Sequence, residues 1–156
     1  MIAIHRVTDP SDVEEIKRLF LCYQADLGVD LCFQSFDEEL ATLPGNYAPP
    51  GGALLIAKDE AGTSLGCIAL RPTNEPARGE IKRLYVTPEA RGKGLGRKLV
   101  EAVLQSAKSA GYNRVCLDTL PSMPEAIGLY RSFGFTEIDP YYTTPLEETL
   151  FLGRQV

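Results

Sequence analysis

The chain has 156 residues and a mass of 17.1 kDa, which suits one compact domain because domains typically hold about 100 to 200 residues. Hydrophobic residues make up 44% of it and charged residues 24%, an ordinary globular composition that excludes disordered, collagen-like and fibrous chains. The net charge is −5, and an acidic surface repels the phosphate backbone of nucleic acids. We therefore predict a single domain over residues 1–156 that does not bind nucleic acid.

The first predicted elements are a strand and a long helix. Residues 3–7 alternate in polarity like an edge strand, and residues 9–14 carry the polar residues of a helix start. Within that start, Ser11 and Glu14 have the spacing of a capping box, in which each side chain binds the other residue's backbone amide. Apolar residues then recur at helical period until Gly28, where glycine favours helix termination.

A short helix, a loop and a β-hairpin are predicted next. Residues 35–43 suit the helix, and residues 44–52 suit a loop because successive prolines interrupt regular hydrogen bonding. Residues 53–58 and 65–71 are apolar runs of strand length, joined by the polar residues 59–63. This pattern is typical of two antiparallel strands.

The remaining sequence alternates strands with helices. Residues 80–87 begin as an alternating strand and end apolar, which suits a strand that is buried at its centre. The elements after it are a helix that stops near Gly111, a strand over 114–118, a short helix over 124–133 and final strands over 135–138 and 149–152. The resulting order, β α α β β β α β α β β, predicts an α/β fold.

The cysteines and the single histidine offer no metal site. Zinc sites need clustered ligands, whereas Cys22, Cys32, Cys67 and Cys116 are widely spaced and form no C-x-x-C pair. We predict buried thiols in a reducing compartment and no bound metal. His5 lies in an alternating run, which favours a half-exposed strand residue over a catalytic base.

Nothing in the sequence points to a membrane. No apolar run reaches the length of about 18 residues that a membrane helix needs. The apolar stretch at the start of the chain is too short for a signal peptide. We therefore predict a soluble, cytoplasmic protein without a membrane partner.

The charges are unevenly distributed along the chain. Residues 78–98 hold seven basic and two acidic residues, a balance of +5, while the other 135 positions hold a balance of −10. A short basic segment in an acidic protein suits a small polyanion, although scattered charges are usually a solvated face.

Three glycines at alternate positions, Gly92, Gly94 and Gly96, lie inside that basic segment, between the predicted strand and helix. Glycines permit left-handed backbone angles that turn successive amides toward one anion, and the start of a helix adds further amides and a positive dipole end. The dinucleotide motif G-x-G-x-x-G fails on spacing, because Arg97 and Leu99 stand where its last glycine belongs, and the P-loop motif has no match. The turn therefore predicts a site for a pyrophosphate.

The spacing R-x-x-G-x-G over residues 91–96 resembles the pyrophosphate-binding signature of the GNAT superfamily of N-acetyltransferases. The strand E-x-x-R-L-Y-V over 80–86 and the helix end L-Y-x-x-x-G-F over 129–135 extend the resemblance. It implies the GNAT fold, a mixed and mostly antiparallel central sheet flanked by helices. It further implies an acyltransferase that uses acetyl-coenzyme A as co-substrate, without a metal, and acetylates an amine.

The resemblance also implies which residues bind the co-substrate. The family often carries asparagine at the position of Met123, which cannot make an amide's hydrogen bonds, so Ser122 or backbone groups are expected to serve there. The implied contacts come from the strand backbone at Leu84, Tyr85 and Val86, from the turn at Arg91, Gly92, Lys93, Gly94, Leu95 and Gly96, and from Arg97.

Two residues are candidates for catalysis. An alkyl ammonium must lose a proton before it attacks a thioester, and Glu80 resembles in position the glutamate that many GNAT enzymes use as general base. The alternative for Glu80 is a surface residue paired with Lys82 or Arg83. Tyr130 matches the family's tyrosine that donates a proton to the sulfur, and its alternative role is core packing. The amide near Val86 suits the oxyanion if the strand bulges there.

The acceptor site is expected in the least generic segments, residues 28–39, 44–52 and 139–148. They are rich in acidic and aromatic side chains, which suit a cationic amine. The sequence thus predicts direct acetylation of a primary amine of a small molecule or amino acid. The candidate residues in these segments are Asp30, Asp37, Glu38, Glu39, Tyr47, Asp139, Tyr141, Tyr142, Glu147 and Glu148.

Three questions stay open at this point. A catalytically silent sensor of acyl-coenzyme A would keep the same glycine turn, and turnover with a panel of amines distinguishes it from an enzyme. Some GNAT toxins act on charged tRNA, which the acidic balance outside the turn opposes. Homodimers are common in the family, but no sequence feature demonstrates one here.

Overall fold

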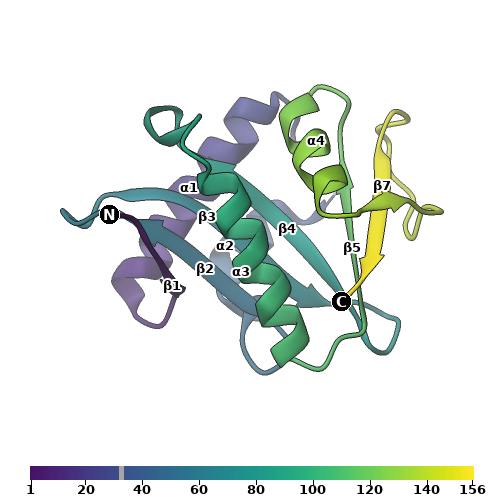
Figure 1. Ribbon diagram of the computed structural model, residues 1–156, viewed down its shortest axis with the longest axis horizontal. Coiled ribbons are helices and arrows are strands. Elements are labelled where there is room, and N and C mark those ends of the chain that lie inside the picture. The colour runs from purple at the N-terminus through teal and green to yellow at the C-terminus, as the bar shows by residue number, and fades with distance from the viewer. Residues whose placement is uncertain (32–33) are drawn as a thin grey trace.

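The computed structural model describes residues 1–31 and 34–156. These residues form a seven-stranded sheet in the order β1-β2-β3-β4-β5-β7-β6 (Figure 1). Only β4 and β5 pair in parallel among these strands, so the sheet is mixed and mostly antiparallel, as predicted. The strands are β1 (Ala3–Arg6), β2 (Ala53–Lys58), β3 (Ser64–Pro72), β4 (Arg78–Val86), β5 (Arg114–Thr119), β6 (Thr136–Glu137) and β7 (Leu150–Gln155).

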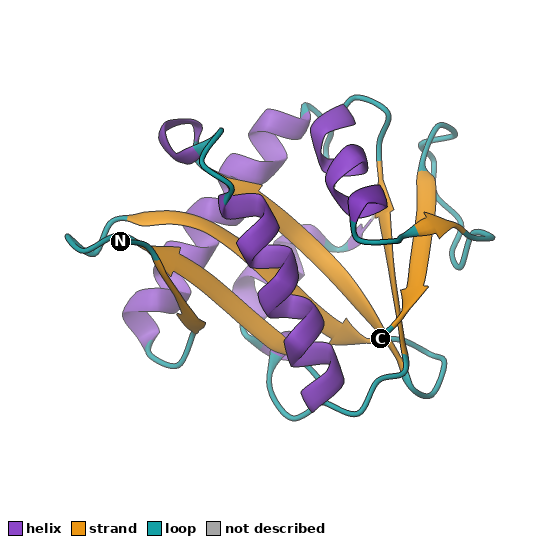
Figure 2. Cartoon of the chain, in the orientation of Figure 1, coloured by secondary structure: helices purple, strands orange, loops and turns teal. Residues whose placement is uncertain are grey.

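Helices cover both faces of this sheet. Helices α3 and α4 lie on the near face in Figure 1, and α1 and α2 lie behind it, an arrangement that Figure 2 shows by element type. The order of strands and α-helices agrees with the prediction, and short 3-10 turns add to it. The helices are α1 (Pro10–Leu27), α2 (Phe36–Thr42), α3 (Leu95–Ser109) and α4 (Pro124–Ser132), with 3-10 turns η2 (Gly45–Tyr47) and η3 (Pro88–Ala90).

The core has two layers because successive residues of a strand point to opposite faces. In β3, Ile68 and Leu70 face the cluster that α3 completes, whereas Cys67 and Ala69 face the cluster that α1 and α2 complete. All four side chains are fully buried. Strand β3 and its neighbour β2 are therefore apolar on both faces, which explains why the middle of each sequence runs nearly continuously hydrophobic.

The start of α1 differs from the expected capping box. The helix begins at Pro10, and Asp9 is the N-cap, because its side chain accepts the backbone amide of Asp12 at 2.9 Å. Ser11 instead donates its hydroxyl to Asp9 Oδ1 at 2.6 Å. The predicted end is confirmed, because Gly28 has a φ of 71° and its amide closes the last turn.

Two irregularities of β4 shape the functional region. First, β4 pairs with β5 only from Arg78 to Glu80, and the two strands separate beyond that point (Figure 1). Second, the pairing with β3 shifts register between Cys67 and Ala69, and Arg83 has a φ of 62°, so β4 bulges there. The bulge at Arg83 lies three residues before Val86, whose amide was expected to suit the oxyanion if the strand bulged there.

The remaining sequence expectations concern the burial of the cysteines, the surroundings of His5 and membrane-spanning helices. Cys67 and Cys116 are buried free thiols and Cys22 is a partly buried one, while Cys32 lies outside the described residues. His5 lies on β1, and its Nε2 is 3.2 Å from Asp12 Oδ2. Within residues 1–31 and 34–156, no helix combines the length and apolar character needed to cross a membrane.

Candidate active site

A groove of about 590 Å³ lies between the end of β4 and the start of α4. The last turns of α1, the turn into α3 and the first turns of α4 form its other walls. Ser122 and Met123 both line it, and Met123 stands at the position where the family often has asparagine. Of the predicted co-substrate residues, those on its walls are Leu84, Tyr85, Val86, Arg91, Gly92, Gly94, Leu95 and Gly96.

The turn into α3 has the geometry of an anion site. Gly92 and Gly94 have φ angles of 79° and 78°, which side chains other than glycine rarely adopt. No heavy atom lies within 4 Å of a Cβ built on either residue, so both face open space. The first amides of α3, which start at Leu95, have no acceptor within the helix, and a phosphate in the groove would accept their hydrogen bonds.

The two arginines of this segment are already held by protein groups. Arg91 donates from Nε to the Val86 carbonyl at 3.0 Å and from a terminal nitrogen to Asp26 Oδ2 at 2.6 Å. Arg97 donates to Ser132 Oγ at 3.0 Å. Neither Arg97 nor Lys93 lines the groove. Of the basic residues from 91 to 98, Arg91 is thus the one on the wall of the groove.

A smaller cavity, which we call the inner pocket, adjoins the groove. It measures about 40 Å³, and it is lined by parts of α1, β4, β5, α4 and the segment that precedes β7. The two cavities meet along a common wall. The residues that line both are Tyr23, Leu27, Leu84, Met123 and Ala126.

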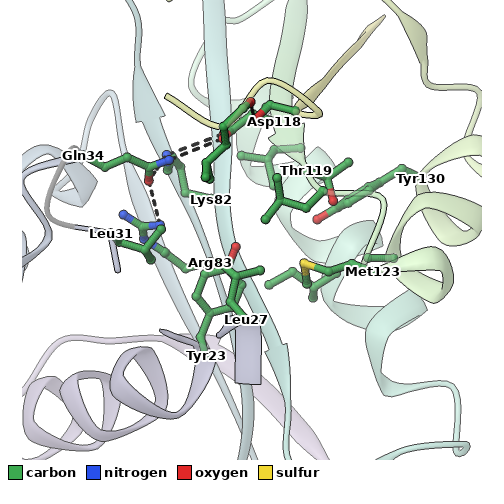
Figure 3. A pocket seen from close by; sticks show the side chains of 16 residues that line it. Tyr23, Leu27, Leu31, Gln34, Lys82, Arg83, Asp118, Thr119, Met123 and Tyr130 are labelled. Carbon is green, nitrogen blue, oxygen red and sulfur yellow. Dashed lines mark hydrogen bonds and ion pairs between the residues drawn. The ribbon is translucent and has the colours of Figure 1, made fainter. Parts of the chain in front are cut away.

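One wall of the inner pocket is polar. Gln34 is its centre, because its Oε1 accepts from Lys82 Nζ at 3.1 Å and from Arg83 at 3.0 Å, and its Nε2 donates to Asp118 Oδ2 at 3.4 Å. Tyr142 donates to the same Asp118 oxygen at 2.7 Å. Figure 3 shows these hydrogen bonds of Gln34 with Arg83 and Asp118 at one end of the pocket.

The bulge in β4 brings two basic side chains into this wall. Lys82 and Arg83 are consecutive, yet both bind Gln34, because the left-handed backbone at Arg83 breaks the alternation of the strand. Burial opposes the charge of Arg83, but Glu39, which accepts two hydrogen bonds from it at 3.0 Å, outweighs that cost and raises its pKa. Burial lowers the pKa of Lys82, and Asp118 and Glu80 offset part of that effect.

Tyr130 lines the inner pocket, one helical turn after Ala126 of the common wall. Its side chain is buried, and its ring packs edge-on against Phe135 with centroids 5.5 Å apart. In Figure 3 its hydroxyl points into the pocket, toward the space that Tyr23 and Met123 also face. Burial raises the pKa of Tyr130, so the phenol keeps its proton at neutral pH. The contact with Phe135 fits the alternative role of core packing, and proton donation by the hydroxyl stays a prediction.

Glu80 is buried and paired. Arg71 donates to its Oε1 at 2.8 Å, and Tyr141 donates to its Oε2 at 2.7 Å. Lys82 Nζ is 4.0 Å from the same Oε2. Glu80 does not line the inner pocket, whereas its neighbour Lys82 does. The alternative of a surface glutamate is wrong, because only 4% of the residue is exposed.

The predicted acceptor segments reach the site only in part. Tyr141 and Tyr142 bind Glu80 and Asp118, and Glu39 binds Arg83. Glu38, Glu39 and Tyr47 also line a separate cavity of about 220 Å³ beside Arg71. The other acidic candidates, Asp30, Asp37, Asp139, Glu147 and Glu148, are exposed and line none of these cavities.

Sequence reasoning missed Gln34, Lys82 and Asp118 as site residues. Lys82 and Asp118 each follow an apolar residue within a predicted strand, which is a usable signal because a charge that such a strand buries requires a partner. Gln34 carries no such signal, since a polar residue is ordinary in the connection between two helices. In the described part of the chain, no cluster of three or more His, Cys, Asp or Glu is arranged to hold a metal ion.

Comparison with known proteins agrees with this geometry. The family model described as the acetyltransferase (GNAT) family matches residues 14–135. An uncharacterized N-acetyltransferase of Schizosaccharomyces pombe is 43% identical over 99% of this chain and 95% of its own. An IAA acetyltransferase of Azospirillum brasilense is 37% identical over 69% of this chain and 70% of its own.

A solved structure shows the same fold. The crystal structure of a GNAT-family acetyltransferase from Staphylococcus aureus superimposes with a TM-score of 0.82, covers 99% of both chains and is 23% identical. The groove, with its glycine turn at a helix start, fits the coenzyme A that this family uses. The chain therefore belongs to the GNAT family and is an acetyl-coenzyme A-dependent N-acetyltransferase.

Proposed function

We propose that this enzyme acetylates a primary amine of a small molecule or amino acid, by direct attack of the amine on the thioester. The groove holds the co-substrate in this proposal, and the inner pocket holds the acceptor. The observation that carries the proposal is the common wall of the two cavities, with the Tyr130 hydroxyl beside it. Direct transfer requires the two reactants to meet at such a place.

Main-chain groups would bind the co-substrate. The amides of the turn from Arg91 to Gly96 would donate to the pyrophosphate, with Lys93 and Arg97 adding charge nearby. The part of β4 that has left β5, residues 84–86, would pair through its backbone with the pantetheine arm. When bound there, acetyl-coenzyme A supplies the acetyl group as a thioester.

Two side chains would move protons. The acceptor nitrogen bonds to the thioester carbon while the carbon–sulfur bond breaks, and Tyr130 donates its hydroxyl proton to the leaving sulfur. The amine's proton passes to Glu80 as general base. Because Glu80 lies outside the pocket wall, the proton would reach it through water rather than by contact.

Two measurements on the purified protein test the proposal. Calorimetry with coenzyme A reports binding in the groove, and release of free thiol from acetyl-coenzyme A reports turnover with a broad panel of primary amines. We expect binding and acceptor-dependent thiol release. Binding without turnover for every amine would contradict the proposal and favour an acyl-coenzyme A sensor.

A further inference from the structure

Lys82 has unused hydrogen-bonding capacity inside the protein. Its side chain is 3% exposed and lines the inner pocket. An ammonium group has three donors, yet among the described residues only Gln34 Oε1 accepts a hydrogen bond from Lys82. The carboxylates of Asp118 and Glu80 lie at 3.6 and 4.0 Å, too far for hydrogen bonds. A buried cation in this state favours an additional oxygen acceptor.

Asp118 has an unused hydrogen-bond acceptor, which complements the unused donors of Lys82. Its Oδ2 accepts from both Tyr142 and Gln34. Its Oδ1 faces Lys82 at 3.6 Å and accepts no hydrogen bond from the described residues. A carboxylate oxygen can accept two hydrogen bonds, so Oδ1 favours an additional donor. The pocket wall thus presents an unfilled donor and an unfilled acceptor close together.

The neighbouring charges are already neutralised. Arg83 is paired with Glu39 at 3.0 Å, and Arg71 is paired with Glu80 at 2.8 Å. Lys82 and Asp118 are the charged pair left on the pocket wall. A ligand that carries only positive charge would be attracted by Asp118 but repelled by Lys82 at short range. A ligand with one charge of each sign would satisfy both groups and leave the site neutral.

We propose that the acceptor is a zwitterion of the amino-acid class, whose ammonium group binds Asp118 and whose carboxylate binds Lys82. This inference rests on the proposed function, because it names the substrate class of the same pocket. Carboxylates bound by buried ammonium groups make strong, charge-assisted hydrogen bonds. Lys82 is then a specificity-determining residue that selects amines with an acid group next to the nitrogen.

Matched acceptors test this inference on the unaltered enzyme. Each proteinogenic amino acid is paired with the amine that lacks its carboxylate, such as leucine with 3-methylbutylamine and serine with ethanolamine, and spermidine serves as a polycation. Thiol release from acetyl-coenzyme A is measured for each. For the preferred amino acid, we expect kcat/KM to exceed that of its matched amine by about 10- to 100-fold.

Variants locate the effect at Lys82. Lys82→Met keeps the length of the side chain and removes its charge, so we expect kcat/KM for the amino acid to fall about 10-fold or more and that for the matched amine to change little. Lys108→Met removes an exposed lysine from the last turn of α3 and serves as the control. The comparison of matched acceptors with the unaltered enzyme decides the question even if Lys82→Met does not fold.

The outcomes separate this inference from the proposed function. Turnover of plain amines in preference to their amino acids overturns the inference and leaves amine acetylation intact. If no acceptor releases thiol although coenzyme A binds, the proposed function fails. In that case calorimetric titration of the same amino acids and amines into the coenzyme A complex decides the inference, which is overturned if amino acids bind no better than their matched amines.

Discussion

The groove and the inner pocket are adjacent, but they are built differently. The end of the groove that suits the pyrophosphate is one continuous stretch, residues 91–96, and it presents main-chain amides at the start of α3. The polar wall of the inner pocket is made of side chains from distant positions. Gln34 lies 48 positions before Lys82 and 84 positions before Asp118.

This difference has a functional consequence. Backbone donors depend on local conformation and tolerate most side-chain changes, so the groove suits a ligand that never varies. Side chains gathered from several elements change the chemistry of a pocket without changing the fold, so the inner pocket suits the ligand that defines one enzyme. The two sites should therefore respond independently to substitution. A change in the inner pocket should leave the Kd of coenzyme A unaltered.

The largest effect is expected from Glu80→Gln. If Glu80 is the general base, we expect kcat/KM to fall by about 100-fold or more and the pH–rate profile to change, while the Kd of coenzyme A stays unchanged. The measurement is thiol release across pH, with calorimetry for the co-substrate. An unaltered pH–rate profile would reduce Glu80 to a structural partner of Arg71 and Tyr141.

Asp12→Asn is the matched control for Glu80→Gln. Asp12 is also buried and paired, with Lys58 and His5, but it lies on α1 away from both cavities. Both variants remove a buried carboxylate charge, and losing one partner of a buried ion pair costs about 3 to 5 kcal/mol. We expect urea denaturation to show lower stability for both and the pH–rate profile to change only in Glu80→Gln.

A smaller and complementary effect is expected from Gly94→Val. A branched side chain at a φ of 78° is strained, and Gly94 lines the groove with open space where its Cβ would stand. Loss of one charge-assisted hydrogen bond to the pyrophosphate raises the Kd of coenzyme A by about 10- to 100-fold. Gly111→Val is the control, because Gly111 has a φ of 90° and open space around it but lies at the other end of α3.

The outcome for Gly94 decides whether the main chain of the turn binds the co-substrate. Equal affinity for coenzyme A in the unaltered protein and in Gly94→Val would contradict that assignment. A loss of the same size in Gly111→Val would attribute the effect to general destabilisation instead.

The next effect is expected at the boundary between the two sites. Tyr130→Phe removes the hydroxyl and keeps the ring contact with Phe135, so kcat should fall about 10-fold, at or below the low end of general-acid effects because a thiolate leaves readily. Burial raises the pKa of Tyr130, so the unaltered enzyme should lose no activity through this group up to about pH 10, the ordinary value for tyrosine.

Tyr112→Phe controls for the loss of a tyrosine hydroxyl. The Tyr112 hydroxyl donates to the Gly51 carbonyl, outside both cavities. Its removal should lower stability by about 1 kcal/mol and leave kcat unchanged. Equal kcat in Tyr130→Phe and the unaltered enzyme would remove Tyr130 from the proton transfer.

The same difference between the sites explains what the sequence could predict. The order of elements and the glycine turn follow from patterns within a few residues, such as apolar periodicity and the spacing from Arg91 to Gly96. Local patterns also produced the error at α1, because Asp9 and Ser11 are both good N-cap residues and only the structure decides between them.

The inner pocket could not be predicted in the same way. Its polar wall exists because β4 bulges at Arg83 and separates from β5 after Glu80, and both features depend on pairing between distant strands. The acidic segments that looked suited to an amine by composition instead place most of their carboxylates on the surface. Composition shows which charges a segment has, but not which of them the fold buries.

The smallest effect is expected from Gln34→Met, a change confined to the inner pocket. Methionine has a similar length but no amide, so Lys82 and Arg83 lose their common acceptor and Asp118 loses a donor. Arg83 keeps Glu39 as its partner, so its position in the pocket wall should be retained. The expected loss of substrate binding energy is therefore about that of one hydrogen bond between a neutral and a charged group. We expect the KM of the acceptor amine to rise about 3- to 10-fold, with kcat and the Kd of coenzyme A little changed.

Gln105→Met, on the exposed face of α3, should change none of these quantities. A rise in the Kd of coenzyme A for Gln34→Met would show that the two sites are energetically linked and would refute their independence.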